Sequence, residues 1–249
     1  MTRHNDHPHN PRTMVFNIID WLHAHHPHHQ FHNRTPVETK GRLIRWASLY
    51  DWVVPLLLGD ERAFRQTTVA LAQIKPGDTV LDVGCGTGSL ALVAKEQAGP
   101  TGRVYGIDAS PEMIAIAQQK AAQAGSNITF QVDVIERLSF PDNQFDVVLS
   151  SLMMHHLPDD LKSQGLTEIY RVLKPGGRVL VVDVESSTGG SLRQKVKDIA
   201  IHMHGGHRLM QNNVKKLVPL VEAAGFINIT TDKINRQTSY VTGLKDAIH

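Results

Sequence analysis

The stretch Val80-Leu-Asp-Val-Gly-Cys-Gly-Thr-Gly-Ser-Leu90 decides the fold of this chain, because it reads as an apolar strand that turns through three glycines into a helix. Gly84, Gly86 and Gly88 leave the backbone open to a ligand and permit positive φ where the chain reverses. Asp82 ends the strand just before these glycines. A strand, a glycine-rich turn and a helix in this order are typical of nucleotide-binding sites.

Strand and helix patterns alternate regularly from this stretch onward. We expect strands at 79–83, 103–107, 128–132, 145–150 and 178–183, helices at 88–97, 111–124, 159–173 and 213–224, a turn at 174–177, and a closing hairpin from 226–231 and 240–244. Strands that alternate with helices of ten or more residues pair in parallel through right-handed crossovers. The sequence therefore predicts a doubly wound α/β domain with a mostly parallel, seven-stranded sheet.

The segments on either side of this core are less regular. Residues 1–34 hold nine of the fifteen histidines and are expected to be a partly disordered extension. We assign 35–249 to the main domain, in which 35–75 reads as N-terminal helices. Residues 185–210 carry two Gly-Gly pairs around a helical centre, and we expect this insertion to cover the site.

Composition excludes several classes of function. The chain has 249 residues, 41% of them hydrophobic, which suffices for a full core, and its net charge of +2 supplies no basic field for nucleic acid. Its longest apolar run, near Trp52, falls far short of the roughly 20 residues that span a bilayer. Cys85 has no second cysteine to pair with, and no secretory signal begins the sequence, so we expect a cytoplasmic protein. The sequence does not decide whether the protein contacts a membrane surface.

Two carboxylates indicate which nucleotide fits the turn. Asp82 lies beneath the glycines, where its charge would repel a pyrophosphate and attract a cationic amino group, so an adenosyl amino acid is favoured over a dinucleotide. Asp108 ends the second strand, twenty residues after Gly88, and can accept hydrogen bonds from both ribose hydroxyls. Its alternative role is to cap the helix at 111–124, although Ser110 suits that role better. The glycines also recur every second residue, which departs from the dehydrogenase pattern.

A third carboxylate follows the third strand. Asp133 could accept a hydrogen bond from an adenine amino group, and Val134 could offer its backbone N–H to the ring. The alternative is that Asp133 is an acidic residue of a surface loop.

Four motifs resemble those of class I S-adenosylmethionine-dependent methyltransferases: VLDVGCGTG at 80–88, GIDASPEM at 106–113, FDVVLS at 145–150 and LKPGG at 173–177. The similarity covers roughly 50–183 and is strongest to the branch of ubiquinone/menaquinone biosynthesis C-methyltransferases. It implies S-adenosylmethionine as cofactor. It assigns Asp82, Gly84 and Gly86 to the methionine end, Asp108 to the ribose, Asp133 and Val134 to adenine, Ser150 to the border of the sulfonium, and Tyr50 to a position over the cofactor.

The resemblance also implies in-line transfer of a methyl group, for which the protein aligns the acceptor and excludes water. A base is needed only where the acceptor carries a proton. His155, in the pair His155-His156 just beyond the fourth strand, is our candidate catalytic base. A structural or cofactor-packing role for the pair is the alternative.

Histidines in the expected cover raise the question of a metal. His202, His204 and His207 could ligate one or line the acceptor pocket. No carboxylate or cysteine accompanies them closely, and the chain is rich in histidine throughout, so we predict no metal site and regard acceptor contact as the better interpretation.

We therefore expect a methyltransferase that acts on a small or lipid-like acceptor, with a quinol precursor as one possibility. The sequence does not indicate an oligomeric state. Two alternatives remain open: a nicotinamide-dependent oxidoreductase, and a catalytically silent protein that binds a cofactor or a metal.

Overall fold

The structure, a computed structural model, describes Thr39 and residues 60–185 and 214–247. Seven strands in these ranges form one sheet in the order β3-β2-β1-β4-β5-β7-β6. The strands are β1 (Thr79–Val83), β2 (Arg103–Asp108), β3 (Ile128–Val132), β4 (Phe145–Ser151), β5 (Leu173–Val184), β6 (Ile227–Lys233) and β7 (Thr238–Leu244). Strands β1 to β5 are parallel to one another, whereas β7 is antiparallel to both β5 and β6. The predicted doubly wound, mostly parallel sheet is confirmed.

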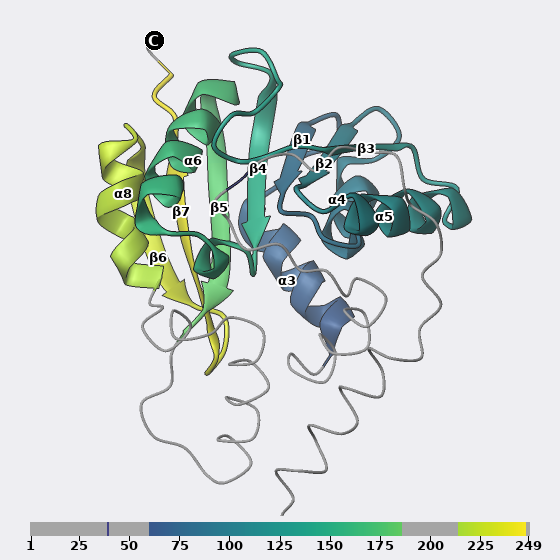
Figure 1. Cartoon of the computed structure of the whole chain (residues 1–249), viewed down its shortest axis with the longest axis horizontal. Helices are drawn as coiled ribbons and strands as arrows, with labels where there is room; N and C mark the ends of the chain where they lie inside the picture. The colour runs from purple at the N-terminus through teal and green to yellow at the C-terminus, as the bar shows by residue number, and fades with distance from the viewer. Residues whose placement is uncertain (1–38, 40–59, 186–213, 248–249) are drawn as a thin grey trace, which may run out of the picture. The chain divides into compact units, whose positions relative to one another are not determined.

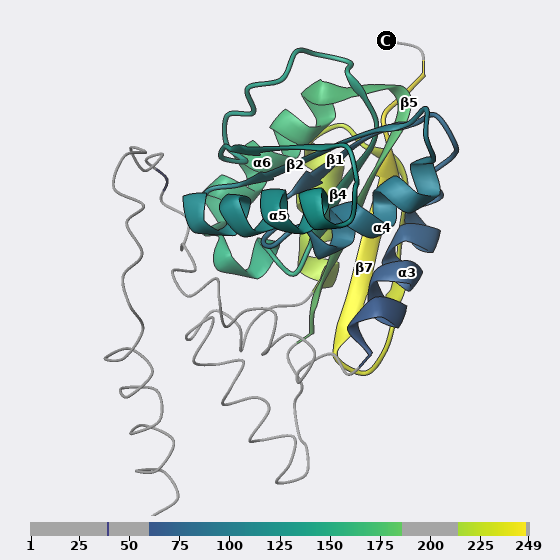
Figure 2. The same ribbon diagram turned by 90° about the vertical axis from the view of Figure 1, so that its right-hand side faces the viewer.

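Helices cover both faces of the sheet (Figure 1). The helices are α3 (Glu61–Ala72), α4 (Ser89–Ala98), α5 (Pro111–Gln123), α6 (Asp159–Val172) and α8 (Val218–Ala223), with 3-10 turns η1 (Met154–His156) and η3 (Val214–Leu217). Buried residues of α3, α4 and α5 pack on one face, and those of α6 and α8 pack on the other. Figure 2 shows α3, α4 and α5 lying along the same side. Two apolar layers therefore hold the sheet between them.

The β1 strand explains why the core forms where it does. Val80 packs into one apolar layer, whereas Leu81 and Val83 pack into the other, because successive side chains point to opposite faces. Asp82 shares the face of Val80, where it is buried at 1% exposure. An ionisable side chain thus occupies a core position at the carboxyl end of a central strand, which is where doubly wound folds bind ligands.

Two boundaries differ from the prediction by more than two residues. Residues 174–177, predicted as a turn, belong to β5, and the register between β4 and β5 shifts there from the pair Phe145–Leu173 to the pair Val147–Arg178. The helix predicted over 213–224 is shorter, because a 3-10 turn over Val214–Leu217 precedes α8. The closing hairpin is confirmed, with β6 and β7 paired in antiparallel fashion.

Several predicted segments lie outside the described residues: the extension at 1–34, most of the N-terminal helices in 35–75, and nearly all of the cover at 185–210. In the described ranges, no helix is long and apolar enough to span a membrane.

Candidate functional site

The glycine turn after β1 is closely packed against its neighbours. Gly84, Gly86 and Gly88 have φ values of 71°, 54° and 80°, which side chains other than glycine rarely adopt. A Cβ on Gly84 would come within 2.3 Å of Met153 Cγ, and one on Gly88 within 2.9 Å of Ala117 Cβ. Glycine is therefore required here both by conformation and by space.

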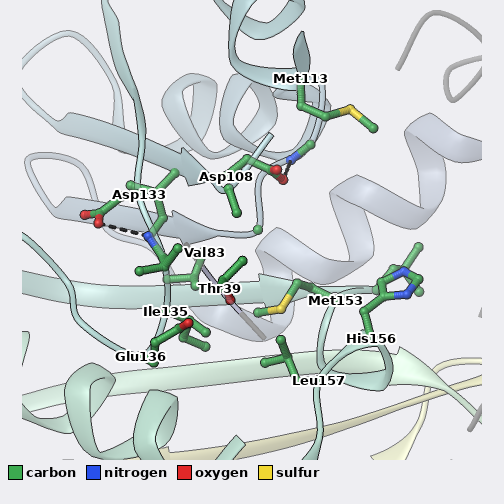
Figure 3. Close-up of a pocket in the computed structure, with 16 residues that line it drawn as sticks. Thr39, Val83, Asp108, Met113, Asp133, Ile135, Glu136, Met153, His156 and Leu157 are labelled. Atoms are coloured by element: carbon green, nitrogen blue, oxygen red, sulfur yellow. Dashed lines mark hydrogen bonds between the residues drawn. The ribbon is translucent and has the colours of Figure 1, made fainter. Parts of the chain in front are cut away.

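A pocket opens beside this turn at the carboxyl edge of the sheet (Figure 3). Its empty volume, including the open mouth, is about 710 Å³. It is lined by Thr39, Val83, Gly84, Gly86, Ile107, Asp108, Ala109, Met113, Asp133, Val134, Ile135, Glu136, Leu152, Met153, His156 and Leu157. The ends of β1, β2, β3 and β4 thus converge on one cavity, which brings together five of the predicted cofactor-binding residues.

Asp108 stands at the end of β2 with its carboxylate fixed by two backbone groups. Gly86 N–H donates to Oδ2 at 3.0 Å and Ser110 N–H donates to Oδ1 at 2.8 Å. Burial raises the pKa of Asp108, while these two hydrogen bonds lower it. Ser110 is the residue that caps α5, with Oγ accepting from Met113 N–H at 3.3 Å. Asp108 is therefore not the helix cap, and it faces the pocket.

Asp82 lies under the glycine turn and has an unsatisfied oxygen. Within the described residues its Oδ2 atom is buried and accepts no hydrogen bond. Burial raises the pKa of Asp82 to about 7; the Arg65 charge lowers it and the Asp108 carboxylate raises it. A buried carboxylate without a full set of partners is costly, and a positively charged ligand group would relieve that cost. The site consequently fits a cofactor with a cationic end.

Asp133 organises the loop that follows β3. Its Oδ1 accepts from Val134 N–H at 2.9 Å, and its Oδ2 accepts from both Ser139 N–H and Ser139 Oγ–H, at 3.0 and 2.7 Å. Asp133 and Val134 both line the pocket. Asp133 Oδ2 also accepts from Gln131 Nε2 at 3.4 Å, so the carboxylate is tied into its own loop and only Oδ1 keeps capacity for a further donor.

His155 does not line the pocket; the structure holds it in a buried pair with Asp183 at the end of β5. His155 Nδ1 lies 2.6 Å from Asp183 Oδ1, and His155 N–H donates to Asp183 Oδ2 at 2.8 Å. The neighbouring His156 lines the pocket, and the centres of the two imidazole rings are 3.9 Å apart. Burial would raise the pKa of Asp183, but the charge of His155 and the hydrogen bonds from His155 and Val184 outweigh it and hold that pKa below its ordinary value.

Two further predicted residues, Asp82 and Ser150, are not among the residues that line the pocket. Ser150 is buried at 1% exposure, and within the described residues its Oγ has no hydrogen-bond partner. Tyr50 lies outside the described residues, as do His202, His204 and His207. In the ranges that the structure describes, no three histidine, cysteine or acidic side chains form a group that could hold a metal.

The sequence did not point to three residues that lie at or next to the site: Asp183, Met153 and Arg65. Asp183 had a usable signal, because it ends an apolar strand as Asp82 and Asp108 do. Met153 and Arg65 had little signal: Met153 stands in a short irregular segment, and Arg65 is a basic residue on an otherwise amphipathic helix. Only the folded chain reveals that the Arg65 side chain is buried.

Comparison with protein families agrees with this geometry. Residues 80–177 match the family model described as a methyltransferase domain. Curated proteins named ubiquinone/menaquinone biosynthesis C-methyltransferase UbiE are 36% identical in Cupriavidus metallidurans and 37% identical in Burkholderia mallei, over 138 residues in each case. These matches cover 55% of this chain and 56% of the relatives, so the chain spans about half the length of the curated relatives it matches.

Solved structures support the fold. A SAM-dependent methyltransferase from Aquifex aeolicus has a TM-score of 0.64 at 22% identity, with 80% of this chain and 97% of that one covered. The cyclase SpnF has a TM-score of 0.60 at 23% identity, with 74% and 80% covered. The expected resemblance to class I S-adenosylmethionine-dependent methyltransferases is confirmed, and the fold is theirs. A cyclase on the same fold means that the reaction must be argued from the site.

Proposed function

We propose that this chain is an S-adenosylmethionine-dependent methyltransferase whose acceptor is a small or lipid-like molecule, with a quinol precursor as the leading candidate. The observation that carries the proposal is the buried Asp82 carboxylate beneath the glycine turn, with one oxygen unsatisfied. A pyrophosphate at this position would face a negative charge, whereas a sulfonium with an ammonium group nearby would be attracted. This favours the adenosyl amino acid over a nicotinamide dinucleotide.

The remaining cofactor contacts follow from the same pocket. We assign Asp108 to the ribose hydroxyls, Asp133 and Val134 to adenine, and Gly84 and Gly86 to the methionine end. Each of these five residues lines the pocket, which supports the assignment. Ser150 at the sulfonium and Tyr50 over the cofactor complete the proposal on the resemblance alone.

When bound, S-adenosylmethionine supplies an electrophilic methyl group on a positively charged sulfur. The chain's own task is then to align an acceptor with that methyl group and to exclude water. Leu152, Met153 and Leu157 give an apolar wall to the part of the pocket that follows β4. Such a wall suits an apolar ring or lipid-like acceptor, and the UbiE relatives, named for quinone biosynthesis, point in the same direction.

We propose His155 as the base that takes a proton from the acceptor. Its Nδ1 is bound to Asp183 at 2.6 Å, which leaves Nε2 as the nitrogen able to accept that proton. The buried Asp183 carboxylate would stabilise the imidazolium that forms, as the aspartate of a catalytic triad does. Because His155 does not line the pocket, the proton would reach it through His156, which lines the pocket: one ring nitrogen of His156 would accept the proton of the acceptor while its other ring nitrogen releases one to His155 Nε2.

Transfer of a labelled methyl group from S-adenosylmethionine to a panel of quinols, phenols, amines and lipids tests the proposal. We expect label in the quinols, and we expect His155→Ala to lower turnover by about 10²–10⁴-fold while the affinity for S-adenosylhomocysteine is preserved. His156→Ala shows whether the ring in the pocket wall is needed as well.

Each negative outcome has a distinct meaning. Binding of S-adenosylhomocysteine without transfer to any member of the panel would favour the catalytically silent alternative. Normal turnover of His155→Ala would remove His155 from the mechanism and leave the cofactor assignment standing.

A further inference from the structure

The loop between β3 and β4 forms one side of the pocket and is held from outside by α6. Residues 133–144 make up this β3–β4 loop, and its first four residues line the pocket. Leu138 and Phe140, at 4% and 8% exposure, belong to the apolar layer that α6 covers. Gly165 of α6 lies so near the loop that a Cβ on it would come within 2.6 Å of Ile135 Cδ1. The loop therefore joins the pocket to this helix.

Arg171, near the C-terminal end of α6, donates all five of its N–H groups to this junction. Nε and Nη2 donate to the two carboxylate oxygens of Glu168, at 2.9 and 2.8 Å. Nη2 also donates to Leu138 O at 2.9 Å, and Nη1 donates to Phe140 O at 2.8 Å and to Asp142 Oδ1 at 2.7 Å. Because a guanidinium presents its five donors in one rigid plane, Arg171 fixes the loop and the helix in a single relative arrangement.

Glu168 holds the same loop from a second direction. Its Oε2 accepts from Leu138 N–H at 2.9 Å, so both backbone groups of Leu138 are bound to α6. The hydrogen bond from Arg171 holds the pKa of Glu168 below its ordinary value, although partial burial raises it. The carboxylate is therefore ionised at neutral pH, and Arg171 and Glu168 together form an ionic clamp on the loop.

One peptide unit connects this clamp to Asp133. The C=O of Leu138 and the N–H of Ser139 belong to the same planar unit, which is rigid. Arg171 donates to its oxygen, and its N–H donates to Asp133 Oδ2 at 3.0 Å. The Ser139 hydroxyl donates to the same Oδ2 atom at 2.7 Å. Arg171, which does not line the pocket, thus sets the direction from which a pocket carboxylate is held.

The two oxygens of Asp133 are used differently as a result. Oδ2 accepts from Ser139 and, at 3.4 Å, from Gln131 Nε2. Within the described residues, Oδ1 accepts only from Val134 N–H, at 2.9 Å (Figure 3). Oδ1 is therefore the oxygen left for a donor on a ligand.

We propose that Arg171 and Glu168 are positioning residues for cofactor binding, which orient Asp133 through the Leu138–Ser139 peptide. The inference rests on the proposed function, which assigns Asp133 to adenine. Without the clamp, part of the binding free energy would be spent on ordering the loop and its carboxylate. With the clamp in place, the protein should distinguish an adenine amino group from a hydrogen atom at the same ring position.

Calorimetric titrations with a matched pair of ligands test this role. The pair is S-adenosylhomocysteine and its 6-deamino analogue, in which hydrogen replaces the adenine amino group. We expect the wild-type protein to prefer S-adenosylhomocysteine by about 10–100-fold, the range for a hydrogen bond to a charged group. Arg171→Met should reduce this preference to less than about threefold, mainly by weakening S-adenosylhomocysteine, because the analogue makes no such hydrogen bond.

Ser139 offers a test that leaves the clamp in place. Ser139→Ala removes one hydroxyl donor from an exposed residue and should lower the preference, whereas Ser139→Thr keeps the hydroxyl and should retain it. Arg137→Met is the matched control for Arg171→Met. Arg137 lies in the same loop but is exposed, so removal of its charge should leave the preference unchanged.

The outcomes separate this inference from the proposed function. If the wild-type protein binds neither ligand, the proposed function fails. If it prefers S-adenosylhomocysteine but Arg171→Met and Ser139→Ala weaken both ligands equally, or weaken neither, the clamp is purely structural and the inference is overturned. Equal binding of the two ligands by the wild type overturns the inference as well, since Asp133 would then recognise no amino group. Should Arg171→Met fail to fold, Ser139→Ala carries the same prediction.

Discussion

At the scale of single residues, the chemistry of this molecule centres on carboxylates at the ends of strands. Asp82, Asp108 and Asp183 end β1, β2 and β5 or stand one residue before the end; Asp82 and Asp183 are buried and Asp108 is half-buried. Their partners differ: Asp108 is satisfied by backbone N–H groups, Asp183 by an imidazole, and Asp82 only in part. Of these three carboxylates, only Asp82 keeps a buried oxygen without a hydrogen bond within the described residues.

We expect the ionised Asp82 carboxylate to lower the stability of the ligand-free protein and to strengthen the binding of a cationic ligand. Its pKa is raised from 3.8 to about 7 in the folded protein, so between these values the folded state binds more protons than the unfolded state, and stability falls as pH rises from about 4 to 7. We expect Asp82→Asn to raise the melting temperature of the ligand-free protein above pH 7. A melting temperature that drops in the variant at pH 8 would contradict this account.

The same carboxylate predicts how binding depends on pH. Only the ionised form attracts an ammonium group, so protonation of Asp82 competes with the ligand below a pKa of about 7. The affinity for S-adenosylhomocysteine should fall as the pH is lowered from 8 to 6, by up to about tenfold per unit once Asp82 is protonated. Asp82→Asn should flatten this profile, and an equally steep profile in the variant would assign the dependence to another group.

At the scale of elements, the site is built by two short segments, one after β1 and one after β4, whose positions are fixed by close contacts with their neighbours. The turn between β1 and α4 packs against Met153 and Ala117, and the segment after β4 is joined to β5 by the pair of His155 and Asp183. These contacts hold the segment after β4 against both the glycine turn and the end of β5. Substitutions in the turn should therefore affect folding and binding together.

Gly88→Ala tests how tightly the turn is packed. Its φ of 80° costs about 1–2 kcal/mol for an alanine, and the contact with Ala117 adds about 1–3 kcal/mol of overpacking. Gly125→Ala is the matched control, since Gly125 has a φ of 59° with open space around it and should cost only the conformational part. Urea denaturation of both variants measures the difference, and equal losses would mean that the turn tolerates a side chain.

Asp183→Asn tests the link between β4 and β5. Removing the charge from one partner of a buried ionic hydrogen bond typically costs about 3–5 kcal/mol, whereas Asp160→Asn, an exposed change on α6, should be near neutral. Because the folded pKa of Asp183 is lowered, its contribution is present above the unfolded pKa and is lost as pH falls through the folded value. The gap between wild type and variant should thus shrink in acid, and a gap that widens there would refute the pairing.

At the scale of the whole molecule, the order of strands and helices could be predicted from the sequence, and the contacts between distant segments could not. The strands from Thr79 to Val132 were located closely because each is a short apolar run bounded by glycine or acidic residues. The start of β5 was placed too late, because the turn signal at Gly176 falls where β5 has extra residues between its pairings with Phe145 and Val147 of β4.

The same limit applies to the site: positions set by the local sequence could be predicted, and contacts between distant segments could not. Asp82, Asp108 and the glycines could be predicted, because their positions at a strand end or in a turn determine where they lie. The partnership of His155 with Asp183 and the burial of Arg65 depend on packing between segments 28 or more residues apart, and no local pattern encodes that. The close contact of Met153 with Gly84 could not be predicted, for the same reason.

The central claim is that a buried carboxylate under the glycine turn selects a cationic adenosyl cofactor, and a calorimetric comparison of S-adenosylhomocysteine with NADH tests it most directly. We predict saturable binding of S-adenosylhomocysteine to the full chain at pH 8, at least tenfold weaker in Asp82→Asn, with no measurable binding of NADH. Preferential binding of NADH, or an affinity for S-adenosylhomocysteine that Asp82→Asn leaves unchanged, would contradict the account.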